Sequence, residues 1–235
     1  MISFISDLHL SFDKPKLTRH FVHFLRTKAR QSSAVYILGD LFDAWVGDDD
    51  FTAPNAEVRR ELKQLTDSGV AVYLQRGNRD FLISERFARG TGVILLDDYA
   101  VIQLESEQTL LTHGDLLCSD DVAYQAFRTK SRASEWQQNV LSKPLWLRLC
   151  AARWYRIRSF WHKQKQSNYV MDVNQITIEN LMKKYQCTRL IHGHTHRPAQ
   201  HEFMLNGQKA QRFVLSDWNN DGGAVLSFGG ENEQT

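Results

Sequence analysis

Short apolar runs alternate with amphipathic segments in the first third of the chain. Residues 2–6, 34–38 and 70–74 are apolar runs that predict buried strands. Residues 16–30 and 55–66 carry apolar side chains at helical spacing and predict the helices that connect those strands. This alternation of strand and helix predicts a largely parallel sheet covered by helices, which is an α/β architecture.

The pattern changes after residue 92, where little room is left for helices between strands. The predicted strands of this part are residues 93–96, 100–104, 109–112, 189–191, 200–205, 212–215 and 223–228. Two helical stretches separate them: residues 120–168 predict a long basic segment, and residues 171–185 predict another amphipathic helix. The second half therefore predicts a further sheet that is interrupted by a helical insertion.

Five short polar motifs stand where predicted strands end. They are Asp7-Leu8-His9, Gly39-Asp40, Gly77-Asn78-Arg79-Asp80, His113-Gly114-Asp115 and Gly193-His194-Thr195-His196. The spacing of two within Asp7/His9 and within His194/His196 puts both side chains on one face of an extended backbone. Because ligands of open α/β sheets bind at the carboxyl ends of the strands, we expect these side chains to form one site.

The side chains of these motifs favour metal binding. Carboxylates, imidazoles and an amide oxygen make a mixed oxygen and nitrogen set that suits Mn²⁺, Fe²⁺, Co²⁺ or Zn²⁺ better than Ca²⁺. The candidate donor residues are seven: Asp7, His9, Asp40, Asn78, His113, His194 and His196. They are more than one ion needs, but they fit two ions that share a carboxylate. Two ions roughly 3.5–4 Å apart are a standard arrangement for hydrolysis of phosphoesters.

The five motifs, in this order from Asp7 to His196, resemble the calcineurin-like metallophosphoesterase superfamily. The resemblance implies a four-layered α/β/β/α sandwich. It also implies that one metal takes Asp7, His9, Asp40 and His196, and that the other takes Asp40, Asn78, His113 and His194. A hydroxide between the two ions would then be the nucleophile.

A narrower resemblance rests on residues 37–50, 77–81, 113–128 and 171–174. These segments are similar to the UDP-2,3-diacylglucosamine diphosphatase family of lipid A biosynthesis. That resemblance implies hydrolysis at the α-phosphate to UMP and 2,3-diacylglucosamine 1-phosphate, with two Mn²⁺ ions, by a peripheral enzyme at the cytoplasmic face of the inner membrane. It implies no nucleic-acid partner, and nothing in the sequence demands more than a monomer.

The same resemblance implies a set of substrate-binding residues. Arg79 stands where the superfamily usually has a histidine, and a guanidinium that pairs with phosphoryl oxygens suits a reaction whose leaving group is a phosphate. The implied substrate contacts are Asn78, Arg79, Asp121, Arg156, Ser159, Lys163, Gln166 and His194. At the position of Gln166 the family commonly has a lysine, so this chain departs from the family pattern there.

Charge is unevenly distributed along the chain. The formal net charge is +2, but residues 136–171 carry seven basic and no acidic residues, which leaves −5 for the remainder. The same window holds four of the six tryptophans. A basic, aromatic surface suits anionic lipid, and it equally suits single-stranded nucleic acid. The family resemblance favours the lipid, with residues 121–168 as a helical lid inserted in a core of residues 1–120 and 169–235.

Two alternatives remain open at this stage. One is a metallophosphodiesterase with the same core that acts on nucleotides or nucleic acid. The other is a metal-free binding scaffold, which is disfavoured because none of the implied ligand residues is missing from the sequence. We also expect Asp80 to orient Arg79 or to cap a helix, and Asp115 to support His113.

Overall fold

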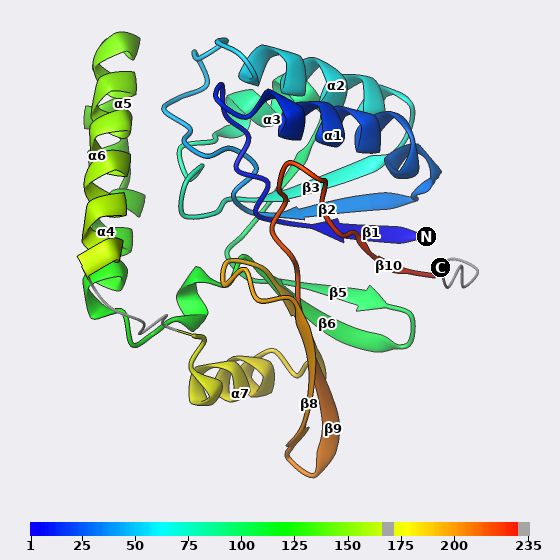
Figure 1. The fold of residues 1–235 in the computed structure, drawn as a ribbon. Helices are drawn as coiled ribbons and strands as arrows, with labels where there is room; N and C mark the ends of the chain where they lie inside the picture. Colours follow the sequence, from blue (N-terminus) through cyan, green and yellow to red (C-terminus); the bar gives the residue numbers. More distant parts are fainter. Residues whose placement is uncertain (166–171, 230–235) are drawn as a thin grey trace.

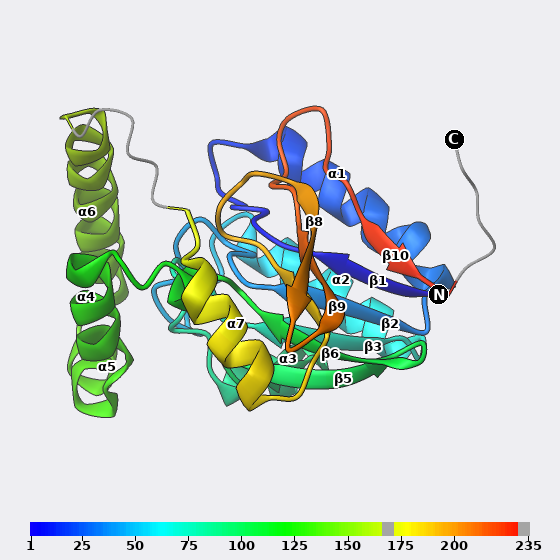
Figure 2. The same cartoon turned by 90° about the horizontal axis from the view of Figure 1, so that it is seen from below.

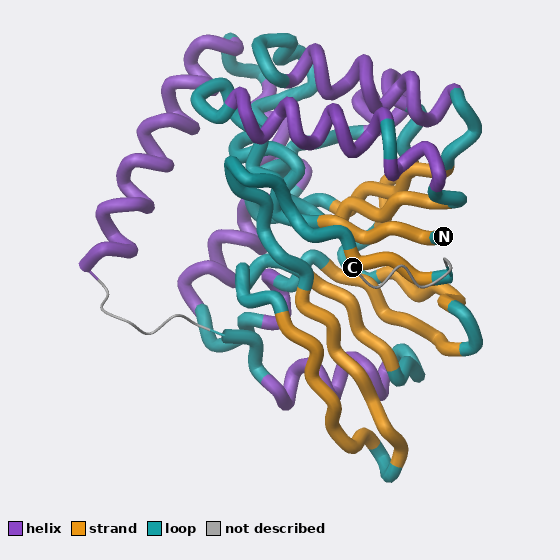
Figure 3. Tube along the Cα trace, turned by 45° about the vertical axis from the view of Figure 1, so that its right-hand side comes forward, coloured by secondary structure: helices purple, strands orange, loops and turns teal. Residues whose placement is uncertain are grey.

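Two five-stranded sheets face each other in the computed structural model (Figures 1 and 3). The structure describes residues 1–165 and 172–229, and it describes side chains in these ranges except over residues 156–165. The first sheet has the order β10-β1-β2-β3-β4. Its strands are β1 (Ile2–Ile5), β2 (Ala34–Leu38), β3 (Ala71–Gln75), β4 (Ile94–Leu96) and β10 (Leu226–Phe228). Strands β1 to β4 are parallel, and β10 pairs antiparallel with β1.

The second sheet has the order β5-β6-β7-β9-β8. Its strands are β5 (Ala100–Leu104), β6 (Glu107–Thr112), β7 (Arg189–His192), β8 (Ala199–Leu205) and β9 (Gln208–Val214). The central strands β6, β7 and β9 are parallel, and the two edge strands pair antiparallel with their neighbours. The carboxyl ends of β1, β2, β3, β6 and β7 therefore meet at one end of the sandwich (Figure 1).

Helices cover the outer face of each sheet (Figure 1). Three helices cover the first sheet, α1 (Pro15–Arg26), α2 (Asn55–Asp67) and α3 (Glu85–Thr91), and α7 (Gln175–Lys184) covers the second. One buried cluster joins α1 and α2 to the first sheet through Phe21 and Leu62, and another joins α7 to the second sheet through Met182. Between the sheets, Phe4 and Ile191 belong to a third cluster. The expected four layers are confirmed.

Three further helices run along one side of the sandwich (Figures 1 and 2). They are α4 (Val122–Arg132), α5 (Ser134–Leu141) and α6 (Leu145–Lys165). The expected single helical stretch is thus divided. It breaks at Ala133, whose ψ of 133° is extended, and again before Pro144, whose carbonyl accepts the first hydrogen bonds of α6. Proline suits a helix start because its missing N–H would have no partner there.

Several boundaries differ from the expected ones for local reasons. Helix α7 begins at Gln175 rather than at residue 171 because the Asn174 side chain accepts a hydrogen bond from the Thr177 N–H, which caps the helix. Strand β9 begins at Gln208, directly after the Asn206-Gly207 turn. Helix α3 was not predicted, since seven residues are too few for a clear helical period. Within the described ranges, no helix combines the length and the apolar character that a bilayer span needs.

Candidate metal centre

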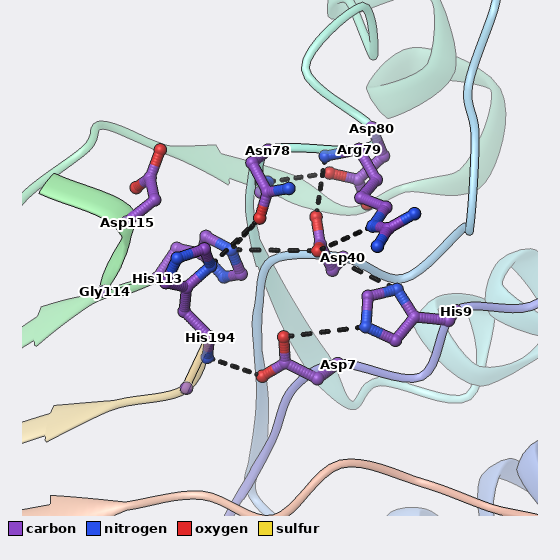
Figure 4. Close-up of polar contacts among 12 residues, drawn as sticks. Asp7, His9, Asp40, Asn78, Arg79, Asp80, His113, Gly114, Asp115 and His194 are labelled. Carbon is purple, nitrogen blue, oxygen red and sulfur yellow. Dashed lines mark hydrogen bonds and ion pairs between the residues drawn. The ribbon is translucent and has the colours of Figure 1, made fainter. Parts of the chain in front are cut away.

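Polar side chains from five strand ends converge on one site between the two sheets (Figure 4). Asp7 and His9 follow β1, Asp40 follows β2, and Asn78 follows β3. The second sheet contributes from β6 and β7: its residues are His113, His194 and His196. Most of these side chains are buried, and Asp7 and Asp40 are almost completely so. The structure therefore brings together all seven residues that the sequence predicts as metal ligands.

The backbone at these strand ends is unusual. Five of the seven residues have a left-handed φ between 47° and 70°, namely Asp7, His9, Asp40, His194 and His196. Hydrogen bonds between neighbouring loops hold this conformation: Asp7 N–H donates to the Gly39 carbonyl at 3.1 Å, and His9 N–H donates to the Asp40 carbonyl at 2.9 Å. Such strain clusters at functional sites, where the surrounding structure fixes a costly conformation.

Two motif glycines allow the loops to approach the carboxylates. A Cβ atom at Gly77 would lie 2.1 Å from Asp40 Oδ1, and one at Gly193 would lie 2.3 Å from Asp7 Oδ2. Neither distance leaves room for a side chain. Because Gly193 has no side chain, the backbone of its motif can approach Asp7, and the His194 N–H donates a hydrogen bond to Asp7 Oδ2 at 2.8 Å.

The first group of donors is Asp7, His9 and His196, whose ligand atoms lie within 4.8 Å of one another. The Nε2 atoms of the two imidazoles face each other at 3.2 Å. His196 Nε2 also lies 3.3 Å from Asp7 Oδ1. Three donor atoms thus point at one another from two strand ends of different sheets.

The second group is Asp7, Asp40 and His113, which also lie within 4.8 Å of one another. Asn78 adds its amide oxygen, which lies 3.0 Å from His113 Nε2 and 3.0 Å from His194 Nδ1. Asp40 Oδ2 is central to the site, at 3.8 Å from His9 Nδ1 and 3.9 Å from His113 Nε2. Its position between the two groups suits a shared ligand.

The donor atoms fit divalent cations. Among the described residues, the buried atoms Asp7 Oδ1 and His9 Nδ1 have no hydrogen-bond partner. A buried polar atom without a partner is costly, and a cation bound by the first group of donors would satisfy Asp7 Oδ1. Carboxylate, imidazole and amide donors suit a first-row transition metal.

Burial and crowded charges also perturb the pKa values of the site. Burial, reinforced by the Asp80 and Asp7 carboxylates, raises the pKa of Asp40 to about 7. Burial alone would lower the pKa of His113, but the carboxylates of Asp40, Asp7 and Asp115 raise it to about 9. Burial lowers the pKa of His9 to about 3. Carboxylates and imidazoles with pKa values moved in opposite directions are typical of an active site.

Comparison with known proteins decides the family. The profile of the calcineurin-like phosphoesterase family matches residues 1–198. The chain is a calcineurin-like phosphoesterase. Families of this kind use a dinuclear metal centre, and the donor cluster described above lies within the matched residues.

This phosphoesterase has close curated relatives. It is 46% identical over 222 residues to the UDP-2,3-diacylglucosamine hydrolase of Escherichia coli O127:H6, covering 94% of this chain and 92% of the relative. The enzyme of the same name from Shigella boydii is 45% identical over the same shares of the two chains. A solved structure of a phosphoesterase from E. coli is 19% identical and has a TM-score of 0.44, with 98% of this chain and 83% of that chain covered.

Arg79 of the phosphoesterase is held at the rim of the donor cluster. Its backbone N–H donates to Asp40 Oδ1 at 2.8 Å, and its guanidinium lies 3.9 Å from Asp40 Oδ2 and 3.4 Å from Asp43 Oδ1. The side chain is one-third exposed. A guanidinium fixed on one side by carboxylates and open on the other can receive an anionic group.

Asp80 has a different role from the expected ones, because it neither orients the Arg79 side chain nor caps a helix. Its carboxylate is completely buried and accepts backbone N–H bonds from Leu41 at 2.7 Å and from Gly77 at 2.7 Å. Asp80 therefore joins the loop that carries Asp40 to the loop that carries Asn78.

Asp115 has the expected influence on His113 and a further role beside it. It acts on His113 through charge, while its Oδ2 atom accepts hydrogen bonds from Tyr124 Oη and, at 2.7 Å, from Arg128 Nε. Tyr124 in turn lies near His194, with ring centroids 6.4 Å apart. Asp115 thus attaches helix α4 to the metal centre.

The remaining predicted substrate contacts belong to the helical insertion. The Asp121 side chain accepts a hydrogen bond from the Tyr124 N–H at 2.9 Å and caps α4. The side chains of Arg156, Ser159 and Lys163, and the whole of Gln166, lie outside the described residues.

Sequence reasoning missed two residues that shape the site. Asp43 holds the Arg79 guanidinium, and Arg132 donates to the Gly77 carbonyl at 2.8 Å. Asp43 stands three residues after the end of the Gly39-Asp40 motif, so a wider search beyond each strand end could have found it. Arg132 lies far along the insertion, and no sequence signal relates it to Gly77.

Proposed function

We propose that this phosphoesterase hydrolyses the diphosphate of UDP-2,3-diacylglucosamine at the α-phosphorus and releases UMP and 2,3-diacylglucosamine 1-phosphate, a step of lipid A biosynthesis. The observation that carries the proposal is the complete set of seven donors at the five strand ends. The choice of substrate is supported by relatives named UDP-2,3-diacylglucosamine hydrolase, which align over 92% of their own length.

The seven donors would hold two Mn²⁺ ions. Asp7, His9, Asp40 and His196 would bind one, and Asp40, Asn78, His113 and His194 the other. When bound, two such ions would polarise phosphoryl oxygens and lower the pKa of water, which supplies the nucleophile. The protein supplies the fixed geometry: backbone hydrogen bonds between neighbouring loops hold the donors before any ion arrives.

Arg79 would contact the diphosphate, together with Asn78 and His194. The open side of its guanidinium suits bidentate pairing with phosphoryl oxygens, which balances the charge that develops on the leaving phosphate. A phosphate leaving group has a second pKa near 6, so a general acid at this position is not required. This chemistry agrees with an arginine at the position where a histidine is usual in the superfamily.

Helices α4 to α6 would form a lid over the substrate, inserted as residues 121–168 in a core of residues 1–120 and 169–235. Two arginines, Arg132 half-buried and Arg148 buried, support a defined position for these helices. Arg132 donates to the Gly77 carbonyl beside Asn78, and Arg148 donates to the Val46 carbonyl at 2.5 Å. The head group would then lie between the lid and the metal centre, near Asp121, Arg156, Ser159, Lys163 and Gln166.

The insertion would also contact the cytoplasmic leaflet of the inner membrane, with the enzyme a peripheral monomer. Trp146 and Trp154 of α6 are 64% and 61% exposed, and Leu147 beside them is 42% exposed. Exposed apolar side chains among basic residues suit the interface of an anionic bilayer.

The proposal is tested by supplying the purified full chain with UDP-2,3-diacylglucosamine in detergent and Mn²⁺, and by measuring UMP. The expected result is steady release of UMP that Asp40→Ala abolishes. No release above that of Asp40→Ala would overturn the proposal. Cleavage of diester oligonucleotides without detergent, in place of UMP release, would instead identify a phosphodiesterase of nucleic acid.

A further inference from the structure

A carboxylate beyond the known motifs approaches the candidate metal centre from its outer side. Asp217 Oδ2 lies 3.6 Å from His196 Nδ1. The other ring nitrogen of His196, Nε2, faces Asp7 at 3.3 Å and His9 at 3.2 Å. Asp217 stands outside the five motifs and after residue 198, where the match to the family profile ends.

His113 has the same arrangement with a different partner. Its Nε2 atom faces Asn78 in the donor cluster, and its Nδ1 atom lies 2.8 Å from the Leu38 carbonyl. Histidines that bind metals generally donate the second ring N–H to a carbonyl or a carboxylate, which fixes the tautomer and the ring orientation. Asp217 lies on the corresponding side of His196, with its Oδ2 atom at an ion-pair distance of 3.6 Å from Nδ1.

His196 needs such support more than His113 does. The side chain of His196 is 39% exposed, whereas that of His113 is 2% exposed and enclosed by its neighbours. The backbone of His196 also has a left-handed φ of 54°. The His196 ring packs against the His9 ring on one side, with centroids 5.2 Å apart, so a polar partner on the exposed side would help to fix its orientation.

The chain fixes Asp217 between two backbone hydrogen bonds. Leu215 N–H donates to the His192 carbonyl at 2.7 Å, and Trp218 N–H donates to the Asp7 carbonyl at 3.2 Å. Asp217 therefore lies in a short segment after β9 that is hydrogen-bonded both to the end of β7 and to the residue that follows β1. These are the two strand ends that supply the first group of donors.

Packing against α1 holds the same segment. Trp218 is 6% exposed, and its ring makes edge contacts with Phe21 and Phe24 at centroid distances of 6.2 and 5.7 Å. His20 Nε2 lies 3.0 Å from the carbonyl oxygen of Asn220. The backbone position of Asp217 is thus set by the fold on both sides and does not depend on His196.

We propose that Asp217 is a positioning residue of the metal centre: its carboxylate accepts the Nδ1–H of His196 and holds Nε2 toward a divalent cation. The inference rests on the proposed metal-dependent function. It implies that Asp217 acts on the affinity of one ion, the one that His196 shares with Asp7 and His9, and acts on the chemical step only through that ion.

The test is titration of Mn²⁺ alone into the chelator-treated full chain, followed by calorimetry and by electron paramagnetic resonance of the free ion. The wild type should bind two ions. Asp217→Asn should bind one of them about tenfold more weakly and the other unchanged. Asp217→Glu should recover part of the loss. In assays of UMP release, Asp217→Asn should need about tenfold more Mn²⁺ for half-activation but reach a similar maximal rate.

Asp221→Asn is the matched control, because it removes the same charge from an exposed position of the same loop. Unchanged affinity for both ions in Asp217→Asn would overturn the inference, and so would an equal loss in Asp221→Asn. Thermal unfolding of the metal-free variants distinguishes a folding defect from a loss of Mn²⁺ affinity. If Asp217→Asn unfolds at a lower temperature than the wild type, the Mn²⁺ affinity of Asp217→Glu decides between the two. A wild type that binds no Mn²⁺ would contradict the proposed function itself.

Discussion

The backbone N–H of Arg79 donates a 2.8 Å hydrogen bond to Asp40 Oδ1. The other oxygen of Asp40 lies 3.8 Å from His9 Nδ1 and 3.9 Å from His113 Nε2. The two oxygens therefore have separate tasks: Oδ1 fixes the loop that carries Arg79, and Oδ2 faces the two groups of donors. A change at Asp40 would disturb both the proposed ligand set and the position of the arginine.

Arg79→Lys tests the role of the guanidinium. Lysine keeps the positive charge but cannot pair bidentately with phosphoryl oxygens. We expect kcat for UMP release to fall about 100-fold, while the affinity for Mn²⁺ stays close to that of the wild type. Both are measured on the purified chain, by single-turnover kinetics and by calorimetry.

Arg86→Lys is the control for this substitution, because Arg86 is exposed on α3. It should leave kcat unchanged. Full activity of Arg79→Lys would rule out bidentate pairing, and a loss of Mn²⁺ binding would mean that Arg79 acts through the ligand loop instead.

Asp80→Ala tests the link between the two ligand loops. The substitution leaves the buried N–H groups of Leu41 and Gly77 without their acceptor, and such groups cost about 1–3 kcal/mol each. We expect the free energy of unfolding of the metal-free protein to fall by about 3 kcal/mol. Urea denaturation measures it. Asp67→Ala, which removes an exposed carboxylate at the end of α2, should cost less than about 1 kcal/mol; equal costs would contradict the linking role.

The sequence predicted the donor residues of the site better than the contacts that hold those residues in place. All seven donors stand one to four residues after a strand end, and the rule that parallel strands bind ligands at their carboxyl ends brings such residues together. The parallel β1-β2-β3 order was predictable for the same reason, since each apolar run is followed by an amphipathic helix.

The supporting contacts depend on packing that no local pattern encodes. Asp217 and His196 are brought together only because β9 pairs with β7 in one register. Arg132 reaches the Gly77 carbonyl across 55 residues, and its partner is a backbone atom that any residue would provide. The insertion is divided into α4, α5 and α6 where one or a few residues leave the helical conformation. The spacing of apolar residues along the sequence does not indicate such short interruptions.

Glu61 gives a prediction for the pH dependence of stability. Arg26 pairs bidentately with its buried carboxylate, at 2.8 and 2.7 Å, and this pairing lowers the pKa of Glu61 below its usual 4.5. The folded pKa is lower than the unfolded one, so the stabilisation is present above about pH 4.5 and is lost as the pH falls through the folded pKa. Glu61→Gln should cost about 1–2 kcal/mol at pH 7.

The measurement is urea denaturation of wild type and Glu61→Gln between pH 7 and pH 3. The difference in unfolding free energy should shrink as the solution is acidified. Glu57→Gln, at an exposed position in the first turn of the same helix, should cost at most about 0.5 kcal/mol. A difference for Glu61→Gln that stays constant down to pH 3 would contradict the assigned cause.

Arg148 attaches α6 to the core, and Arg148→Met should release it. The Arg148 side chain is 5% exposed, and its guanidinium donates to the Val46 carbonyl and to the Asp49 carboxylate. The Asp49 carboxylate is 47% exposed, so the loss of the bond to the Val46 carbonyl dominates and costs about 1–3 kcal/mol locally. We expect faster cleavage of α6 by chymotrypsin and a lower rate of UMP release, with slow hydrolysis of a small phosphodiester retained.

Arg153→Met is the matched control for α6, because Arg153 is exposed on the same helix. It should leave the cleavage rate unchanged. Loss of both the lipid reaction and the small-phosphodiester reaction in Arg148→Met would mean that α6 supports the core fold, and unchanged cleavage would mean that Arg148 does not fix the helix.

Trp146→Ala combined with Trp154→Ala tests the membrane-facing role of α6. Both indoles are more than half exposed, and their burial in a bilayer interface would contribute about 1.5 kcal/mol each. We expect the double variant to bind vesicles that contain anionic lipid about 100-fold more weakly, as measured by co-sedimentation, and to keep its hydrolysis of a small phosphodiester. Met204→Ala removes an apolar side chain that is 62% exposed on β8, and it should bind vesicles as the wild type does. Equal binding by the wild type and the double variant would exclude α6 as the membrane contact, because no other change in that variant compensates for the lost apolar area.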